Sequence, residues 1–327
     1  NNETILTVND LKVYFPVLGG WMKKKIADVK AVDGVSFEIK KGETFGLVGE
    51  SGCGKSTIAR TILRLNDITE GQIIFNGHDI TGLDDVKMRP IRRNMQMIFQ
   101  DPYGSLDPRQ RAGDIVKEPM LNFDLGMSKQ EMEDRVLELF RLVGLDPAYR
   151  ERVPHEFSGG QRQRLVIARA LAANPSFIVC DEAISALDVS IQAQVINLLE
   201  ELQQKMDLTY LFIAHDLSVV RHISDRVAVM YLGQLVEMAD WESLYDNPMH
   251  PYTQALLEAV PIADPEIEAS RERQIIKGEV PSPMQRPRGC AFSSRCPYAM
   301  EECMEKMPEL TEKEPGHKVA CYKVLKQ

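Results

Sequence analysis

The feature that most constrains this fold is a glycine-rich segment at residues 49–56, which reads GESGCGKS and matches the pattern G-x-x-x-x-G-K-[ST] in full. An apolar run at residues 45–48 precedes it, and a stretch that opens a helix at Thr57 follows it. Glycines let consecutive backbone N–H groups point inward as a nest for an anion, and the positive end of the helix dipole adds to that attraction. The segment therefore predicts a strand, a phosphate-binding loop and a helix, and with them an α/β fold that binds a nucleoside triphosphate.

Two side chains of this loop have defined tasks on a triphosphate. Lys55 supplies a point charge for the β- and γ-phosphates, and the Ser56 hydroxyl is a ligand for Mg²⁺. Cys53 is better interpreted as a small filler than as a redox residue. A chance glycine-rich turn is the alternative, and the agreement of strand, loop and helix argues against it. We expect the nucleotide to contact Gly49, Glu50, Ser51, Gly52, Cys53, Gly54, Lys55, Ser56 and Thr57.

An acidic pair follows a second short run, residues 177–180, which is apolar at every position. Such a run is typical of a buried parallel strand, and ligands of open α/β sheets bind at the carboxyl end of such strands. Asp181 would hold Mg²⁺ through water, and Glu182 would act as the general base on the attacking water. A buried acidic pair without a function is costly, so we expect both carboxylates to be functional.

The remaining pattern alternates between strand and helix. Val35, Phe37 and Ile39 alternate with polar residues, as in a half-buried strand. Ser128 and Glu131 form a capping box before a helix, and apolar positions between residues 191 and 202 make one helical face. A run at residues 211–214 predicts another buried strand, and two strands flank Gly233 as a hairpin. This order predicts a mainly parallel sheet covered by helices.

Prolines accumulate after residue 247, and the periodicity fades there. We therefore expect a nucleotide-binding domain at residues 1–246, with a helical subdomain at about residues 101–170, and a loop-rich C-terminal extension at residues 247–327.

Charge and hydropathy exclude several classes of function. The chain has 39 Lys+Arg and 48 Asp+Glu, a formal charge of −9, which argues against wrapping DNA or RNA. Its apolar runs are too short to cross a bilayer, and residues 1–10 lack the basic and apolar regions of a secretory signal. We expect any membrane role to come through a partner.

Four of the six cysteines, Cys290, Cys296, Cys303 and Cys321, lie close together in the sequence. A non-exported chain keeps its thiols reduced, so a bound metal or cluster explains four neighbouring cysteines better than disulfides do. The spacing lacks the tight knuckles of structural zinc sites, whereas wide loops suit an iron–sulfur cubane, in which each thiolate binds a separate iron. Four free thiols, or zinc with His317 as another ligand, remain as alternatives.

A further set of short motifs resembles the nucleotide-binding subunit of an ABC transporter, over residues 5 to about 240. Residues 158–161 resemble the signature motif, with Phe157 where Leu is commoner, and residues 185–188 resemble the D-loop. Gln100 resembles the Q-loop glutamine, and His215 the switch histidine. The aromatic residue that stacks on adenine is matched by Phe15 or by its neighbour Tyr14.

This resemblance implies a P-loop NTPase with a RecA-like core, an antiparallel β subdomain and an α-helical signature subdomain, to which the cysteine-rich extension is added. It implies catalytic roles for Glu182 and His215 and a Mg²⁺ site made by Ser56, Gln100 and Asp181. Two such subunits meet head to tail in the family. The signature would therefore touch an ATP held by the partner, through Ser158, Gly159, Gly160 and Gln161.

A closer resemblance is to the oligopeptide/dipeptide importer ATPases, and most to the F subunit of the pair, the OppF and DppF type. It is carried by residues 49–53, 97–102, 179–190 and 250–253 and by the cysteine-containing tail. Ala183 and Ile184 depart from the common Pro-Thr of ABC proteins and leave Glu182 intact. In this family the tail holds a [4Fe-4S] cluster, which makes that cofactor, besides ATP and Mg²⁺, the expectation for the four thiols.

The resemblance also implies the partners: a homologous second ATPase subunit as a heterodimer, two transmembrane permease subunits and, through the complex, an extracytoplasmic peptide-binding protein. It implies no nucleic acid and a peripheral place on the cytoplasmic face of the cell membrane.

Three rival functions are an importer of another substrate such as nickel, a non-transport ABC ATPase of DNA repair or ribosomes, and a regulatory subunit with a dead site. The acidic charge and single nucleotide-binding domain argue against the second of these. Intact Lys55, Asp181, Glu182 and His215 argue against the third.

Overall fold

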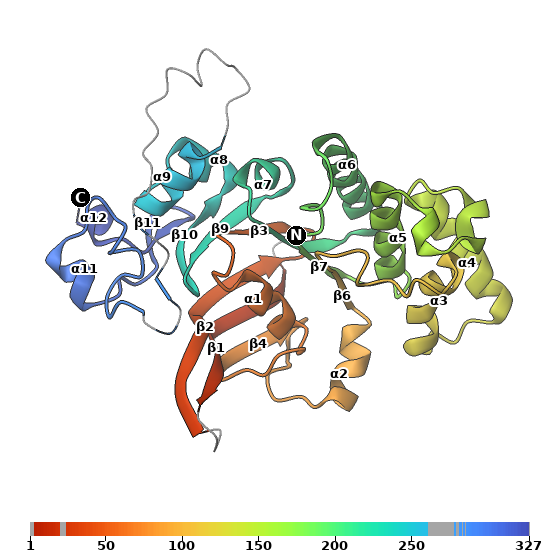
Figure 1. The fold of residues 1–327 in the computed structure, drawn as a ribbon, viewed down its shortest axis with the longest axis horizontal. Coiled ribbons are helices and arrows are strands. Elements are labelled where there is room, and N and C mark those ends of the chain that lie inside the picture. Colours follow the sequence, from red (N-terminus) through yellow and green to blue (C-terminus); the bar gives the residue numbers. More distant parts are fainter. Residues whose placement is uncertain are drawn as a thin grey trace, which may run out of the picture. The chain divides into compact units, whose positions relative to one another are not determined.

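The computed structural model describes residues 3–19, 24–260, 278, 281–282, 284 and 286–326 (Figure 1). Residues 261–277, part of the expected extension, therefore lie outside the described residues. The chain divides into two compact units that interleave along the sequence. The first unit comprises Asn1–Thr4, Lys40–Thr44 and Gly82–Ile213, and the second comprises Ile5–Ile39, Phe45–Thr81 and Ala214–Gln327.

The first unit contains a parallel sheet. In it β7 (Phe177–Asp181) lies between β6 (Met95–Ile98) and β8 (Thr209–Ala214), and both neighbours run parallel to it. Every residue of β7 and of β8 is buried. The apolar runs in the sequence thus predicted both strands correctly, because strands covered on both faces need apolar side chains at each position.

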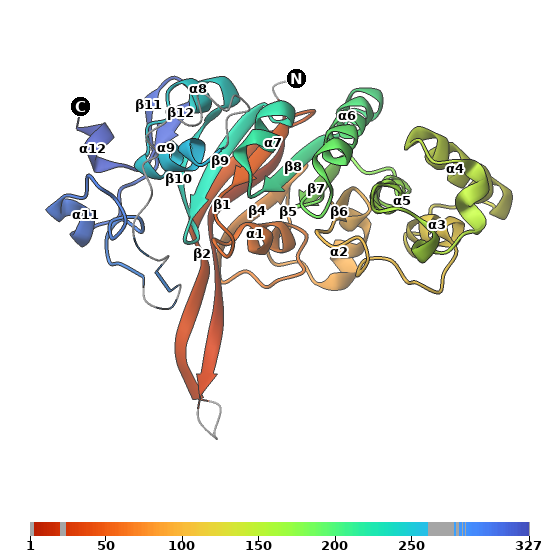
Figure 2. The same ribbon diagram turned by 45° about the horizontal axis from the view of Figure 1, so that its top comes forward.

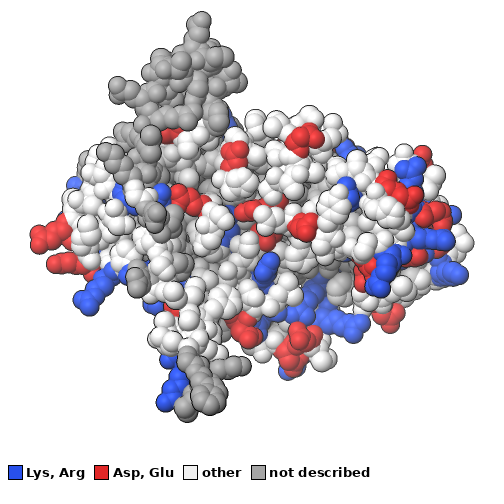
Figure 3. Space-filling model, in the orientation of Figure 1, with Lys and Arg blue, Asp and Glu red and all other residues white. Residues whose placement is uncertain are grey.

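In the first unit α2 and α5 contact β6, and α3, α4 and α5 contact one another (Figure 1). The predicted capping box at Ser128 begins α4, and a second capping box at Ser158 begins α5. On the face drawn in Figure 3, acidic and basic side chains are mixed over α3 and α4. The helices and 3-10 turns of this unit are α2 (Asp85–Arg92), α3 (Ala112–Asn122), α4 (Lys129–Leu142), η1 (Pro147–Glu151), η2 (Pro154–Glu156), α5 (Gly159–Leu171) and α6 (Val189–Met206).

The second unit contains an antiparallel sheet with the strand order β2-β1-β4-β5. Its long strands β1 and β2 run side by side (Figure 2), and the predicted alternation of Val35, Phe37 and Ile39 is confirmed because all three are buried. A tight turn at Asn76 and Gly77, both with positive φ, joins its last two strands. The strands are β1 (Thr4–Gly19), β2 (Lys24–Lys40), β4 (Glu70–Phe75) and β5 (His78–Asp79).

The other strands of this unit include β3 (Thr44–Val48), which runs parallel to β9 (Arg226–Tyr231). The predicted hairpin at Gly233 is present and pairs β9 with β10 (Gln234–Asp240). Among its described residues, the helices of this unit are α1 (Lys55–Ile62), α7 (Leu217–Ile223), α8 (Trp241–Asp246), α9 (Pro251–Glu258), α11 (Glu301–Glu305) and α12 (Tyr322–Leu325).

The C-terminal extension is more regular than its sequence indicates. Its strand β12 (His317–Val319) pairs with β10, and β11 (Thr311–Glu314) pairs with β12, so the tail lengthens the sheet instead of remaining a loop. A strand of three residues is too short to produce a periodic pattern in the sequence, and its pairing with β10 supplies the regularity.

Among the described residues, no helix is long and apolar enough to cross a membrane.

Candidate functional site

The glycine-rich loop lies between β3 and α1, as predicted, and two of its glycines are required by backbone geometry. Gly49 has a φ of 155°, and Gly54 has a φ of 110°. A Cβ at Gly49 would lie 2.1 Å from the carbonyl oxygen of Met230, and one at Gly54 would lie 2.2 Å from that of Ala31. Gly54 is also the N-cap of α1 and has no capping side chain, which suits a helix start that binds phosphate.

Lys55 lies inside this loop and is 3% exposed. Its Nζ donates to the carbonyl oxygens of Gly49 at 2.7 Å and Glu50 at 3.1 Å. Cys53 is buried beside it, and burial raises the pKa of its thiol. This agrees with the prediction that Cys53 packs as a small side chain and is not reactive. Of the remaining loop residues, Ser51 and Gly52 are exposed, and Ser56 and Thr57 are half-buried.

The two candidates for the adenine-stacking aromatic, both on β1, have different surroundings. The Tyr14 hydroxyl donates to Asp33, and the Lys30 ammonium lies 5.1 Å from the Tyr14 ring centroid. Burial and the hydrogen bond to Asp33 raise the pKa of this phenol. Phe15 is 42% exposed, so its ring is the more accessible of the two for stacking.

In the first unit, the predicted acidic pair lies at the end of β7. Asp181 is the last, buried residue of the strand. Glu182 follows with a φ of 47°, a left-handed conformation that costs a non-glycine residue energy and is typical of functional sites. The Gln100 amide donates to Glu182 Oε2 at 2.7 Å, which brings together two residues predicted from separate motifs.

The signature residues form the start of α5. Ser158 Oγ accepts from the Gln161 N–H at 3.3 Å, and the Gln161 side chain accepts from the Ser158 N–H at 3.0 Å. Gly160 packs closely on α6, because a Cβ there would lie 2.8 Å from Ile191. Phe157, which departs from the common Leu, is buried edge-on against Tyr149 at a centroid distance of 5.9 Å.

Two other motif residues lie at helix starts. Asp188 of the D-loop caps α6, where its carboxylate accepts from the Ile191 N–H, and this hydrogen bond lowers the pKa of Asp188. His215 comes directly after β8 in the chain and belongs to the second unit. It is exposed and precedes Asp216, the N-cap of α7.

The four clustered cysteines of the second unit line one small cavity of about 10 Å³ together with His250 and Phe292. All six cysteines of the chain lie within the described residues and carry free thiols. Burial and the neighbouring thiols raise the pKa of Cys290 to about 11. In the described part of the chain, no three His, Cys, Asp or Glu side chains are already arranged to hold a single metal ion.

His317, the alternative zinc ligand, is engaged elsewhere. It is buried on β12, where its Nε2 lies 2.7 Å from Glu237 Oε1, and the described lining of the thiol cavity does not include it.

Sequence reasoning missed the contacts that the extension makes with the nucleotide-binding elements. Arg295 pairs with Glu50 of the glycine-rich loop at 2.9 Å, and Arg286 pairs with Asp33 at 2.7 Å. These partners are 245 and 253 residues apart along the chain, and no local sequence signal links them.

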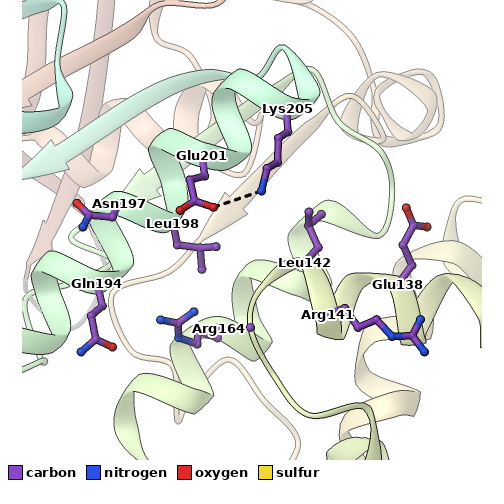
Figure 4. Close-up of a pocket in the computed structure, with 10 residues that line it drawn as sticks. Glu138, Arg141, Leu142, Arg164, Gln194, Asn197, Leu198, Glu201 and Lys205 are labelled. Atoms are coloured by element: carbon purple, nitrogen blue, oxygen red, sulfur yellow. Dashed lines mark hydrogen bonds and ion pairs between the residues drawn. The ribbon is translucent and has the colours of Figure 1, made fainter.

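The first unit also has an open cavity of about 680 Å³ between the end of α4, α5 and α6 (Figure 4). Its lining includes Arg141, Arg164 and an ion pair of Lys205 with Glu201 at 3.3 Å. None of the motif residues is among the described residues that line it, so it is separate from the candidate site.

Comparison with known proteins gives matches along nearly the whole chain. The family model described as "ABC transporter" matches residues 32–185, and the one described as "Oligopeptide/dipeptide transporter, C-terminal region" matches residues 236–303. The chain is 57% identical to the oligopeptide transport ATP-binding protein AppF of Bacillus subtilis, over 98% of both chains. It is 50% identical to OppF of Salmonella typhimurium, over 98% of this chain and 97% of the relative.

The chain belongs to the family of oligopeptide and dipeptide transport ATP-binding proteins.

Among solved structures, this ABC protein is similar to the ATP-binding cassette MJ0796, seen as a dimer in a post-hydrolysis state bound to ADP and Pi. The TM-score is 0.65 at 29% identity, over 72% of this chain and 99% of the cassette. The match confirms the ABC cassette fold that the sequence motifs predicted. The C-terminal family model ends at Cys303 and thus includes three of the four clustered cysteines.

Proposed function

We propose that this chain is the ATP-binding and ATP-hydrolysing subunit of an importer of oligopeptides or dipeptides. The observation that carries the proposal is the complete set of ABC elements in a chain that matches oligopeptide transport ATP-binding proteins from end to end. We assign the nucleotide-binding domain to residues 1–246, with the helical subdomain at about residues 101–170, and the extension to residues 247–327.

The glycine-rich loop binds the triphosphate in this proposal. Its backbone N–H groups and the start of α1 face the phosphates, and Lys55 exchanges its bonds to the Gly49 and Glu50 carbonyls for phosphate oxygens. Phe15, exposed on β1, stacks on the adenine.

Mg²⁺ is assigned to Ser56, Gln100 and Asp181. A hydroxyl, an amide oxygen and a carboxylate are the hard oxygen donors that this ion prefers, and the carboxylate is a buried one at the end of β7. When bound, Mg²⁺ neutralises charge on the phosphate oxygens.

Glu182 is the general base that takes a proton from the attacking water. Its backbone is left-handed, and the Gln100 amide donates to Oε2 at 2.7 Å, which holds the carboxylate in place. His215 acts near the γ-phosphate. Most of the rate then comes from positioning and from fixed charges.

The proposed assembly uses the signature, of which Ser158 is exposed and Gly159, Gly160 and Gln161 are half-buried. Ser158, Gly159, Gly160 and Gln161 open α5 as a second anion site, which contacts an ATP held by a homologous ATPase subunit in a head-to-tail heterodimer. This pair docks on two transmembrane permease subunits at the cytoplasmic face of the membrane, and a peptide-binding protein delivers the substrate.

For the extension we propose a [4Fe-4S] cluster held by Cys290, Cys296, Cys303 and Cys321. Four thiols that line one cavity support it. A cubane takes one thiolate on each of its four irons, and these four thiols would supply them.

Two experiments test these assignments. Turnover of ATP by the assembled transporter is expected to fall at least about a hundredfold with Glu182→Gln, while ATP binding persists. The exposed control Glu201→Gln should retain turnover, and near-normal turnover of the Glu182 variant would disprove its role. Iron and acid-labile sulfide analysis of anaerobically purified protein tests the cluster, because zinc without iron would exclude it.

A further inference from the structure

Glu50, the second residue of the glycine-rich loop, is held through three of its groups. Its N–H donates to the Tyr252 hydroxyl at 2.9 Å, and its carbonyl accepts from Lys55 Nζ at 3.1 Å. Its carboxylate accepts two hydrogen bonds from Arg295, at 2.9 and 3.3 Å. Two of these three partners, Tyr252 and Arg295, belong to the extension.

Arg295 is built into this position. Its side chain is 8% exposed, and its Nη1 also lies 3.2 Å from the Tyr231 hydroxyl. The Arg295 N–H donates to the Phe292 carbonyl at 3.0 Å, which fixes the turn between Cys290 and Cys296. The Phe292 ring packs on Tyr231 and Tyr252 at centroid distances of 5.3 and 5.4 Å. The turn that bears two of the clustered thiols therefore also places the guanidinium.

The charge of Glu50 makes this contact relevant to phosphate. A carboxylate in a loop that binds a triphosphate repels the ligand, and a paired guanidinium cancels most of that repulsion. Glu50 is 29% exposed, so solvent screens the carboxylate only in part. Its carbonyl also accepts from Lys55, so a shift of Glu50 alters the setting of the phosphate-binding ammonium.

We infer that Arg295 is a positioning residue for nucleotide binding: through Glu50, the cysteine-bearing turn of the extension sets the affinity of the glycine-rich loop for MgATP. This inference deepens the proposed function and rests on the assignment of this loop as the ATP site. The extension is then part of the nucleotide-binding site. A change in the turn that bears Cys290 and Cys296 would alter the affinity for ATP.

The test measures the dissociation constant of MgATP on the full-length chain by competition with trinitrophenyl-ATP. Arg295→Met leaves the Glu50 carboxylate unpaired and is expected to weaken MgATP binding about tenfold. The double variant Glu50→Gln/Arg295→Met removes the repulsion and should return the affinity to within about twofold of Glu50→Gln alone. Arg288→Met, an exposed arginine of the same segment, is the matched control and should bind as the original chain does.

Two results would overturn the inference. One is an unchanged MgATP affinity in Arg295→Met, and the other is a double variant that binds as weakly as Arg295→Met alone. Where thermal unfolding shows that Arg295→Met does not fold, Arg295→Lys decides, because it keeps the charge and loses the bidentate geometry. It should weaken binding about threefold, and an affinity equal to that of the original chain contradicts the inference.

Turnover of the assembled transporter separates positioning from general damage. A positioning role raises the KM for ATP and leaves kcat within about twofold, whereas loss of folded protein lowers kcat. Failure of the inference leaves the original chain able to bind MgATP with a normal effect of Glu182→Gln. Failure of the proposed function instead removes MgATP binding from the original chain itself.

Discussion

At the scale of single residues, a buried carboxylate connects the extension with the sheet. Glu237 on β10 is fully buried, and its oxygens accept from the Met249 N–H at 2.6 Å and the His250 N–H at 2.9 Å. The His317 ring pairs with the same carboxylate at 2.7 Å. Such a group is satisfied only while all its donors remain in place, so Glu237 couples β12 to the segment that begins α9.

Replacement of Glu237 by Ala is expected to lower the free energy of unfolding by about 3 kcal/mol, because it leaves buried donors without an acceptor. Urea unfolding followed by circular dichroism measures the change. Glu242→Ala, at an exposed position on α8, is the matched control and should change stability by less than about 0.5 kcal/mol. Equal stabilities of the two variants would show that Glu237 does not hold the extension.

Contacts between residues that are close in the sequence could be predicted, and contacts between distant residues could not. The roles proposed for Lys55, Asp181 and Glu182 rest on motifs in which neighbours along the chain are neighbours in space. Arg295 and Glu50 are 245 residues apart, and their pairing depends on the path of the extension, which the sequence pattern does not encode. The Gln100 to Glu182 hydrogen bond is intermediate, because each residue was predicted and their contact was not.

At the scale of elements, a capping box begins two helices that have different proposed roles. Ser128 and Ser158 each form a capping box, at the starts of α4 and α5. Ser128 sets the start of a helix that carries no motif, whereas Ser158 also opens the signature. Comparison of the two serines therefore distinguishes the structural role of the cap from the role proposed for Ser158 in ATP turnover.

Ser128→Ala and Ser158→Ala are each expected to lower the free energy of unfolding by about 1 kcal/mol, since each removes one N-cap acceptor. Only Ser158→Ala should also reduce ATP turnover of the assembled transporter, by at least about tenfold, because in the proposed pair its hydroxyl contacts the ATP that the partner subunit holds. Thermal unfolding and phosphate release give the two readouts. A turnover in Ser158→Ala as high as in Ser128→Ala would mean that Ser158 is only a cap.

Elements with a strong local pattern were predictable from the sequence. The buried strand β7, the hairpin at Gly233 and the capped helix α4 each combine a periodic or fully apolar run with a turn or cap signal. The short strands β11 and β12 lack such a signal, because pairing and not intrinsic propensity makes them strands: β12 pairs with β10, and β11 pairs with β12.

At the scale of the whole molecule, the chain passes between two units, and the residues of the proposed site are divided between them. The second unit carries the glycine-rich loop and Arg295, and the first carries Gln100, Glu182 and the signature. In the proposed head-to-tail pair each nucleotide contacts the loop of one subunit and the signature of the other. Bound ATP then links the subunits, and hydrolysis releases them.

This arrangement predicts nucleotide-dependent association. Glu182→Gln, mixed with the homologous ATPase subunit and MgATP, should elute as a dimer in size-exclusion chromatography with light scattering, because ATP persists and keeps both anion sites occupied. Without nucleotide, or with MgADP, the same mixture should elute as monomers. Adding Ser158→Ala to the Glu182 variant removes one signature contact and should shift the mixture toward monomers. A dimer that forms equally well with and without MgATP would show that other surfaces hold the two subunits together. Bound ATP would then not be what stabilises the dimer.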